Sequence, residues 1–254
     1  MSSTLRLLYY PASQPSRSVQ QLLMECSIPY EPQIVDVVAG ENETPEFRAK
    51  YNPTGSIPIL VDGDFCLFES AAIARYVAEK YDIPKHWFGE TLPEKGRVEQ
   101  YINWHWTYLR RGAGAFHYEL IAPSIWGDHD YSREVRKGRV LLDESMQMIE
   151  GWLEKSPYLA GDKVSFADLL CYQEYVSNLG GEIITEADWQ RLPKTAAWYA
   201  QMDARPHTEE INGTIREACK MLVSGGKLPF KRKTSMIKGT EVDGGYTREV
   251  NYTD

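Results

Sequence analysis

Cysteine is scarce in this sequence, and no long apolar run occurs in it. The four cysteines, Cys26, Cys66, Cys171 and Cys219, are widely spaced and form no CxxC pair, and no histidine lies at metal-ligand spacing from them. We therefore expect reduced thiols, no disulfide framework and no bound metal. No stretch approaches the roughly 18 consecutive apolar residues of a membrane-spanning helix, so we expect no membrane span.

An excess of positive charge is also lacking. The 28 lysines and arginines are outnumbered by 36 aspartates and glutamates, which gives a formal net charge of -8. This balance disfavours nonspecific binding to nucleic acid, although a local cluster of donors can still bind an anionic ligand. The first residues, MSSTLRLLYYPAS, lack the basic segment, apolar stretch and cleavage site of a secretory signal. We therefore predict a cytoplasmic location and no nucleic-acid partner.

The hydrophobic pattern changes near residues 81–84, and this change predicts two domains. Before it, strand-like and helix-like periods alternate, and after it the periodicity is almost purely helical. Asp62-Gly63 joins two short apolar runs and favours the tight turn of an antiparallel hairpin. In the first region we predict strands at residues 5–9, 34–37, 57–61 and 65–68, and helices at residues 19–26 and 70–80.

The resulting fold class combines a mixed domain with a helical one. The order βαβ then ββα predicts a thioredoxin-like domain at residues 1–82, although this order alone also fits other small α/β folds. Residues 90–223 predict an all-helical bundle, in which Ser165-Phe166-Ala167-Asp168 resembles a capping box that starts a buried helix. Residues 224–254 lack apolar periodicity, which predicts a mobile polar tail, with a lid over the site as the alternative.

Ser13 is the first residue with a chemical role to consider. It stands where the first strand gives way to the first helix, in the segment Ser-Gln-Pro-Ser-Arg at residues 13–17. A helix N-terminus offers unpaired amides and a partial positive charge, so a thiolate beside this hydroxyl would gain the dipole and a hydrogen bond. The alternative is that Ser13 or Ser16 only caps the helix.

Two other strand ends carry similar signals. Pro58 opens a predicted strand and cannot donate to a ladder, so the backbone at Ile57 is free to pair with a ligand's peptide group, above all if the Ile57–Pro58 bond is cis. Glu69 and Ser70 begin a helix, where a carboxylate and a donor-rich terminus match the head group of an α-amino acid. An ordinary edge proline and a capping serine are the respective alternatives.

Together these segments make the sequence similar to the cytosolic glutathione S-transferases, above all the theta class. The resemblance runs from Leu5 to about Leu222. Its elements are Ser-Gln-Pro-Ser-Arg at 13–17, Asn-Pro-Thr-Gly-Ser-Ile-Pro at 52–58, Asp-Gly-Asp-Phe at 62–65 with Glu69-Ser70, Trp104 with Leu109-Arg110-Arg111, and Ser-Phe-Ala-Asp-Leu at 165–169.

The resemblance implies a glutathione transferase that is a homodimer and uses glutathione as co-substrate with a hydrophobic electrophile. By that match Ser13 stabilises the thiolate, Ile57 pairs with the cysteinyl group, Pro58 is cis, and Glu69 and Ser70 hold the γ-glutamyl end. Asn42 falls at another glutathione-binding position. Because Asn42 and Gly55 stand where relatives often have histidine and a basic residue, the resemblance leaves open how the glycyl carboxylate is held.

The electrophile pocket belongs to the helical domain. Trp106, Arg110 and Phe116 lie in an aromatic and basic segment that suits apolar ligands with a leaving group or a negative charge, and Arg110 also matches a ligand-facing position in theta relatives. The alternative is that these aromatics are simply core.

Three functions remain open at this stage. The first is conjugation of electrophiles, for which peroxide reduction and dehalogenation are related activities. The second is a noncatalytic binding or assembly module of the same fold. The third is a thiol-disulfide or deglutathionylating enzyme, which would need a cysteine at the position of Ser13, and Cys26 lies too far along the helix to replace it.

Overall fold

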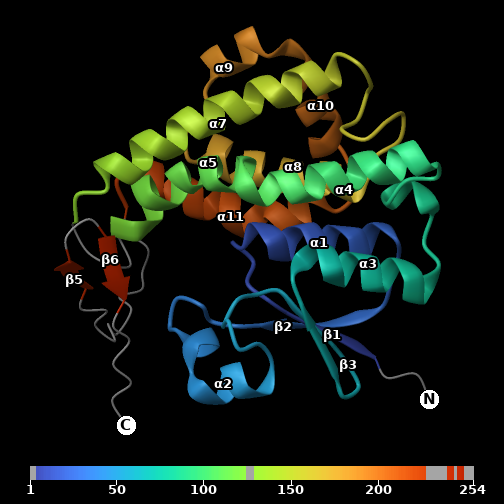
Figure 1. Cartoon of the computed structure of the whole chain (residues 1–254), viewed down its shortest axis with the longest axis horizontal. Coiled ribbons are helices and arrows are strands. Elements are labelled where there is room, and N and C mark those ends of the chain that lie inside the picture. The colour runs from blue at the N-terminus through green and yellow to red at the C-terminus, as the bar shows by residue number, and fades with distance from the viewer. Residues whose placement is uncertain (1–3, 124–128, 227–238, 243–244, 249–254) are drawn as a thin grey trace.

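The computed structural model describes residues 4–123, 129–226, 239–242 and 245–248. Its N-terminal part combines strands and helices (Figure 1). In chain order the elements are β1 (Leu5–Tyr9), α1 (Gln14–Glu25), β2 (Tyr30–Ile34), η1 (Glu41–Glu43), α2 (Pro45–Lys50), β3 (Ile59–Asp62), β4 (Phe65–Phe68) and α3 (Ser70–Tyr81).

These strands form one mixed sheet in the order β2-β1-β3-β4. β1 pairs in parallel with β2 and antiparallel with β3, and β3 forms the predicted antiparallel hairpin with β4. Helices α1 and α3 lie on one face of the sheet and α2 on the other (Figure 1). The predicted βαβ–ββα order and thioredoxin-like architecture are therefore confirmed.

Both faces of the sheet are buried, because successive side chains of a strand point to opposite faces. Leu7 and Leu60 are fully buried in the core shared with α1, α3 and the helical domain. Their neighbours Leu8 and Ile59 are fully buried in a smaller core with Phe47 of α2. The sheet is thus fixed between two layers of helix, and this holds its loop ends in place.

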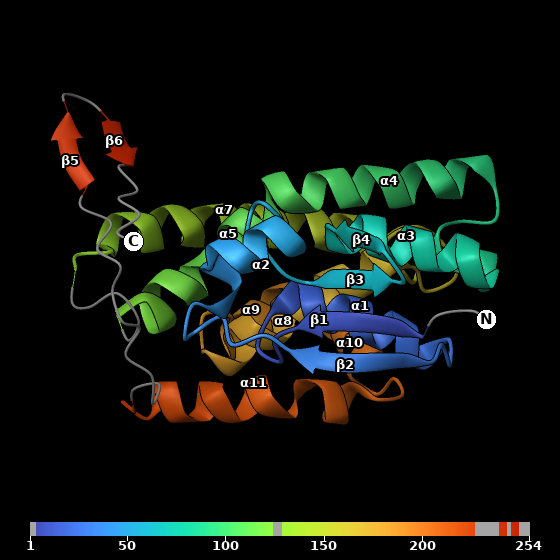
Figure 2. The same cartoon turned by 90° about the horizontal axis from the view of Figure 1, so that it is seen from below.

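A short linker with η2 (Lys85–Trp87) leads to the helical part. Seen from below, α4 lies beyond the β4 edge of the sheet and α11 beyond the β2 edge (Figure 2). The elements of this part are α4 (Leu92–Thr107), α5 (Leu109–Phe116), the π-helical turn η3 (His117–Ile121), α7 (Ser132–Leu153), α8 (Phe166–Gly180), α9 (Glu186–Arg191), α10 (Pro193–Asp203) and α11 (Thr208–Val223).

Helix α8 is the central element of this bundle, and it packs against α1 of the first domain. It begins with the capping box that the sequence predicts, in which Asp168 accepts hydrogen bonds from the backbone N–H and the hydroxyl of Ser165, both at 2.8 Å. The Asp168 carboxylate also accepts from the indole of Trp198 at 3.0 Å. One buried carboxylate therefore starts the helix and ties it to α10.

Two predicted elements differ from the structure. The second strand ends at Ile34, so the prediction of a strand at 34–37 was wrong: β2 is an edge strand, and its Ile34 is 58% exposed. The apolar period of Val98, Tyr101, Ile102, His105 and Leu109 predicts one helix, but the helix is broken at Tyr108, whose φ and ψ of -119° and -80° separate α4 from α5. Leu109 is nevertheless fully buried. The apolar pattern therefore continues across the break and gives no sign of it.

Some features lay outside the sequence-based prediction. The short helices α2 and α9 were not predicted, although Thr44 before Pro45 caps α2 by accepting from the Phe47 N–H at 3.2 Å. Most of the predicted tail falls outside the described residues, and its described parts pair as β5 (Gly239–Val242) and β6 (Gly245–Arg248). No helix in the described ranges is long and apolar enough to cross a membrane.

Candidate active site

Ser13 lies at the N-terminus of α1 with its hydroxyl uncommitted to the helix. It occupies the N-cap position with an extended backbone, and its carbonyl accepts from the Arg17 N–H at 3.0 Å, but its side chain makes no capping bond. The side chain is half-buried. Because the first-turn amides and this hydroxyl face the same terminus, they can act together on an anion such as a thiolate.

Arg17 fixes the segment that carries Ser13. Its guanidinium is fully buried and donates to the carbonyl of Ala12, the residue before Ser13, at 2.7 Å. It also donates to the Gln173 side chain at 2.7 Å and to the Ser177 hydroxyl at 2.9 Å, both on α8. Burial lowers the pKa of Arg17 to about 10, so it is still charged at neutral pH. The Ser13 loop is therefore tied to the helical domain.

The Ile57–Pro58 peptide bond is cis, as predicted. Ile57 is half-buried and precedes β3, whose ladder with both neighbouring strands begins at Ile59. The backbone of Ile57 therefore lies beyond the sheet pairing, where it can meet the peptide group of a ligand. The role of Ile57 and Pro58 in binding glutathione stays a prediction.

Glu69 and Ser70 follow the end of β4. The β3–β4 ladder ends at the Ile59–Phe68 pair, so Glu69 and Ser70 leave the sheet at the same end at which Ile57 and Pro58 enter it. Glu69 has a φ of +71°, a conformation that non-glycine residues rarely adopt and that is concentrated at functional sites. The Ser70 hydroxyl oxygen is buried and has no hydrogen-bond partner among the described residues. An exposed carboxylate and an unused hydroxyl thus meet at the start of α3.

Asn42 lies in the loop before α2 and supports the turn that leads to Ile57. Its Nδ2 donates to the carbonyl of Gly55 at 2.7 Å, while its buried Oδ1 has no partner within the described chain. Gly55 has a φ of +69°, and a Cβ there would lie 2.7 Å from the Asn42 carbonyl oxygen, so this turn requires glycine. Asn42 therefore has a clear structural role, and its contact with glutathione stays a prediction.

The three residues predicted for the electrophile pocket have different surroundings. Phe116 is 9% exposed and belongs to the main core, and Trp106 packs partly buried against that core. Arg110, whose side chain is 43% exposed, donates to both oxygens of the buried Glu174 at 3.0 and 3.1 Å. The core alternative thus describes Phe116 well, while Arg110 lies at the edge between core and solvent.

A buried carboxylate determines the charge of this region. Burial opposes the ionisation of Glu174, but Arg110 and the neighbouring His105 together lower its pKa. Burial lowers the pKa of His105, which lies 3.5 Å from Glu174, and burial with Arg110 lowers the pKa of His117 to about 4. At neutral pH the Arg110 cation is therefore balanced by the Glu174 anion, and both histidines are neutral.

Several residues of the site escaped the prediction from sequence. Gln173, Glu174 and Ser177 are buried polar residues on α8, and all three bind the arginines described above. A polar series within an otherwise apolar helix is a signal that could have identified them. Arg48 of α2 also lies against the Gly55 turn, with its Nε 3.1 Å from the point that a Gly55 Cβ would occupy. No local signal in the sequence distinguishes Arg48 from a surface arginine.

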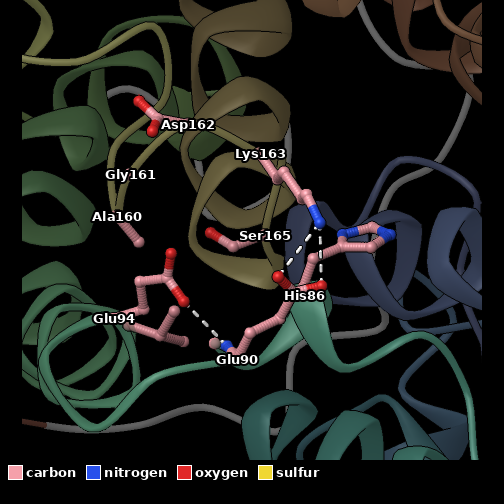
Figure 3. Close-up of a pocket in the computed structure, with 10 residues that line it drawn as sticks. His86, Glu90, Glu94, Ala160, Gly161, Asp162, Lys163 and Ser165 are labelled. Carbon is pink, nitrogen blue, oxygen red and sulfur yellow. Dashed lines mark hydrogen bonds and ion pairs between the residues drawn. The ribbon is translucent and has the colours of Figure 1, made fainter.

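A small cavity at the domain linker is separate from these residues. His86, Glu90, Glu94 and Lys163 are among its lining residues, and Lys163 is paired with Glu90 (Figure 3). Its volume of about 10 Å³ matches one water molecule, so it has no room for a tripeptide. Within the described residues, no group of three or more His, Cys, Asp or Glu could hold a metal ion.

Known proteins are similar to this chain in both sequence and fold. Residues 3–79 match the model of the glutathione S-transferase N-terminal domain, and residues 115–206 match that of the C-terminal domain. The chain is 47% identical over 255 residues to the dichloromethane dehalogenase of Methylophilus leisingeri, an alignment that covers 99% of this chain and 96% of that protein. It is 34% identical over 203 residues to human glutathione S-transferase theta-2, covering 79% of this chain and 81% of the relative.

Solved structures agree with these relationships. Human glutathione transferase theta-2, in complex with glutathione and an unknown ligand, superimposes with a TM-score of 0.81 at 30% identity, covering 90% of this chain and 94% of that one. The matched domains and the solved structure indicate the same family, and the likeness to human theta-2 in sequence and structure indicates the theta class. The chain therefore belongs to the glutathione S-transferase family, is similar to its theta class, and conjugates glutathione to electrophiles.

Proposed function

We propose that this protein is a glutathione-dependent dehalogenase that acts on small, uncharged haloalkanes. The observation that carries the proposal is the uncommitted Ser13 hydroxyl at the positive end of α1, tied in place through Arg17. A bound thiolate at this hydroxyl is a nucleophile able to displace halide. The relative that is 47% identical to this chain over nearly its whole length is a dichloromethane dehalogenase, which supports a haloalkane as the substrate class.

The reaction is a displacement at carbon. The thiol of glutathione loses its proton to water, and Ser13 donates a hydrogen bond to the resulting thiolate, since a serine hydroxyl is too weak a base to remove that proton. The sulfur then attacks the carbon that carries the halogen: a carbon–sulfur bond forms, the carbon–halogen bond breaks, and the halide leaves with the bonding electrons. Proximity of the two reactants and their removal from water lower the barrier.

The charge balance around Arg110 favours an uncharged second substrate. Glu174 neutralises Arg110, and the adjoining His117 is neutral, so the Arg110–Glu174 pair offers no net positive charge to an anionic electrophile. Trp106 adds a partly buried aromatic surface, and Phe116 lies in the core. We assign Trp106, Arg110 and Phe116 to the electrophile side of the site on this basis.

Glu69 and Ser70 are proposed to hold the γ-glutamyl end of glutathione. Either Glu69→Ala or Ser70→Ala should weaken glutathione binding about 10-fold, because each loses one charge-assisted hydrogen bond to the ligand. Isothermal titration with glutathione measures this loss. A matched control is Glu79→Ala, which removes a carboxylate near the other end of α3. Unchanged glutathione affinity in both site variants would remove these residues from the binding site.

A substrate panel tests the proposed activity. We expect halide release and thioether formation with dihalomethanes and short alkyl halides to exceed the rates with aryl halides, epoxides and organic hydroperoxides. A protein that releases no halide but conjugates one of the other classes would show that the dehalogenase assignment is wrong. A protein that binds glutathione but leaves its thiol protonated would instead favour the noncatalytic module.

A homodimer and a cytoplasmic location complete the proposal. Large apolar side chains are exposed at Phe65 on β4, at Leu92 on α4, at Tyr108 between α4 and α5 and at Val140 on α7. Contact with a second copy of the chain would remove this apolar surface from water. Sedimentation equilibrium at micromolar protein concentration gives the oligomeric state, and a monomeric mass there would contradict the dimer.

A further inference from the structure

The turn at residues 52–56 is held rigidly by its own hydrogen bonds. The fully buried Asn52 donates through Nδ2 to the Ser56 carbonyl at 2.8 Å, and its Oδ1 accepts from the Thr54 N–H at 3.0 Å. The Gly55 N–H donates to the Asn52 carbonyl at 2.9 Å, and Asn42 holds the Gly55 carbonyl. This rigid turn leads directly to Ile57 and the cis peptide bond, so a ligand that meets Ile57 also meets the turn.

A cation from α2 lies against this turn. A Cβ on Gly55 would sit 3.1 Å from Nε and 3.3 Å from Nη2 of Arg48, so the guanidinium occupies the space that the missing side chain leaves. Nε of Arg48 is buried and donates no hydrogen bond to any described residue. No ion pair joins Arg48 to a carboxylate in the described part of the chain. The Arg48 cation is therefore partly buried against the turn and has no carboxylate partner among the described residues.

The direction of a bound tripeptide follows from the roles proposed above. If Ser70 holds its γ-glutamyl end and Ile57 pairs with its cysteinyl group, glutathione extends from the start of α3 past Ile57 towards the turn at residues 52–56. Its glycyl end then lies alongside Ser56 and Gly55, the residues that precede Ile57. That end carries the second carboxylate of the tripeptide, and it arrives at the turn against which Arg48 lies.

We propose that Arg48 binds the glycyl carboxylate of glutathione and thereby selects the tripeptide over γ-glutamylcysteine. A guanidinium presents paired N–H groups that match a carboxylate, so it supplies the cation that neither Asn42 nor Gly55 provides. The proposal rests on glutathione being the co-substrate of this site. Gly55 is part of the arrangement, because a side chain at this position would occupy the space that the Arg48 guanidinium now fills.

The test compares ligands with and without the glycyl carboxylate. Dissociation constants of glutathione, of its glycyl ethyl ester and of γ-glutamylcysteine are measured by calorimetry for the wild type, Arg48→Ala and Arg48→Lys. We expect the wild type to bind the ester and the dipeptide about 10- to 100-fold more weakly than glutathione. Arg48→Ala should bind glutathione about 10- to 100-fold more weakly than the wild type does and should bind all three ligands with similar affinity. Arg48→Lys should recover part of the preference for glutathione.

Lys50→Ala is the matched control, since it removes a cation from the same helix whose ammonium lies over the ring of Tyr51. It should retain the wild-type preference for glutathione. The same preference in Arg48→Ala as in the wild type would overturn the assignment, as would equal binding of all three ligands by the wild type. A wild type that binds none of them would instead contradict the proposed function, so the two failures differ.

Discussion

Replacing Ser13 by alanine is expected to lower turnover roughly 10- to 100-fold while leaving most of the glutathione affinity in place. The hydroxyl and the dipole of α1 both act on the charged sulfur, and the hydrogen bond from the hydroxyl to the thiolate contributes about 1.5–3 kcal/mol of that stabilisation. Removing the hydroxyl returns the bound thiol towards its protonated form, because the thiolate loses its hydrogen bond. Steady-state kinetics and ultraviolet titration of the bound thiolate measure the two consequences independently.

Ser16→Ala is the matched control for this change. The Ser16 hydroxyl is in the first turn of the same helix, but it is fully buried and has no hydrogen-bond partner among the described residues. Its loss should leave the pKa of the bound thiol and the turnover close to wild type. If Ser13→Ala also behaves like the wild type, the thiolate is stabilised by something other than this hydroxyl, and the catalytic assignment of Ser13 is wrong.

Elements with strong local signals could be predicted from the sequence. The hairpin at Asp62-Gly63 and the capping box at Ser165–Asp168 both form as predicted, because each depends on residues within a few positions of one another. The second strand was predicted at the wrong residues because β2 lies at the sheet edge, where the alternation of buried and exposed residues is weak. The break at Tyr108 left no trace in the apolar pattern, since Leu109 is buried on the far side of it.

The candidate site was predictable where its residues stand at strand ends. Ser13, Ile57 and Ser70 follow or precede strands of one sheet, and the topology alone brings such positions to a common edge. Arg48 could not be identified in this way, because its position depends on how α2 packs against the Gly55 turn. The side-chain partners of Arg17 on α8 lie more than 150 residues away in sequence, so only the docking of α8 reveals them.

Arg17→Met is expected to lower the free energy of unfolding by about 3 kcal/mol and to raise the pKa of the bound thiol. Methionine approximates the volume of the side chain but leaves the Ala12 carbonyl, Gln173 and the Ser177 hydroxyl without the donor that satisfies them, and each unpaired buried group costs about 1–3 kcal/mol. For a chain of this size the melting temperature should fall by roughly 6–12 °C.

The thiol pKa separates a positioning role from a purely structural one. Arg17 holds the residue before Ser13, so freeing that carbonyl lets the hydroxyl drift from the sulfur, and thiolate absorbance should appear at higher pH even well below the melting temperature. Arg6→Met is the matched control, because Arg6 makes a single bond of 3.3 Å to Gln33 on the same sheet. Arg17→Lys should rescue stability only in part, since one ammonium group cannot reach the Ser13 loop and both positions on α8 at once. A normal thiol pKa in a destabilised Arg17→Met protein would limit Arg17 to joining the two domains.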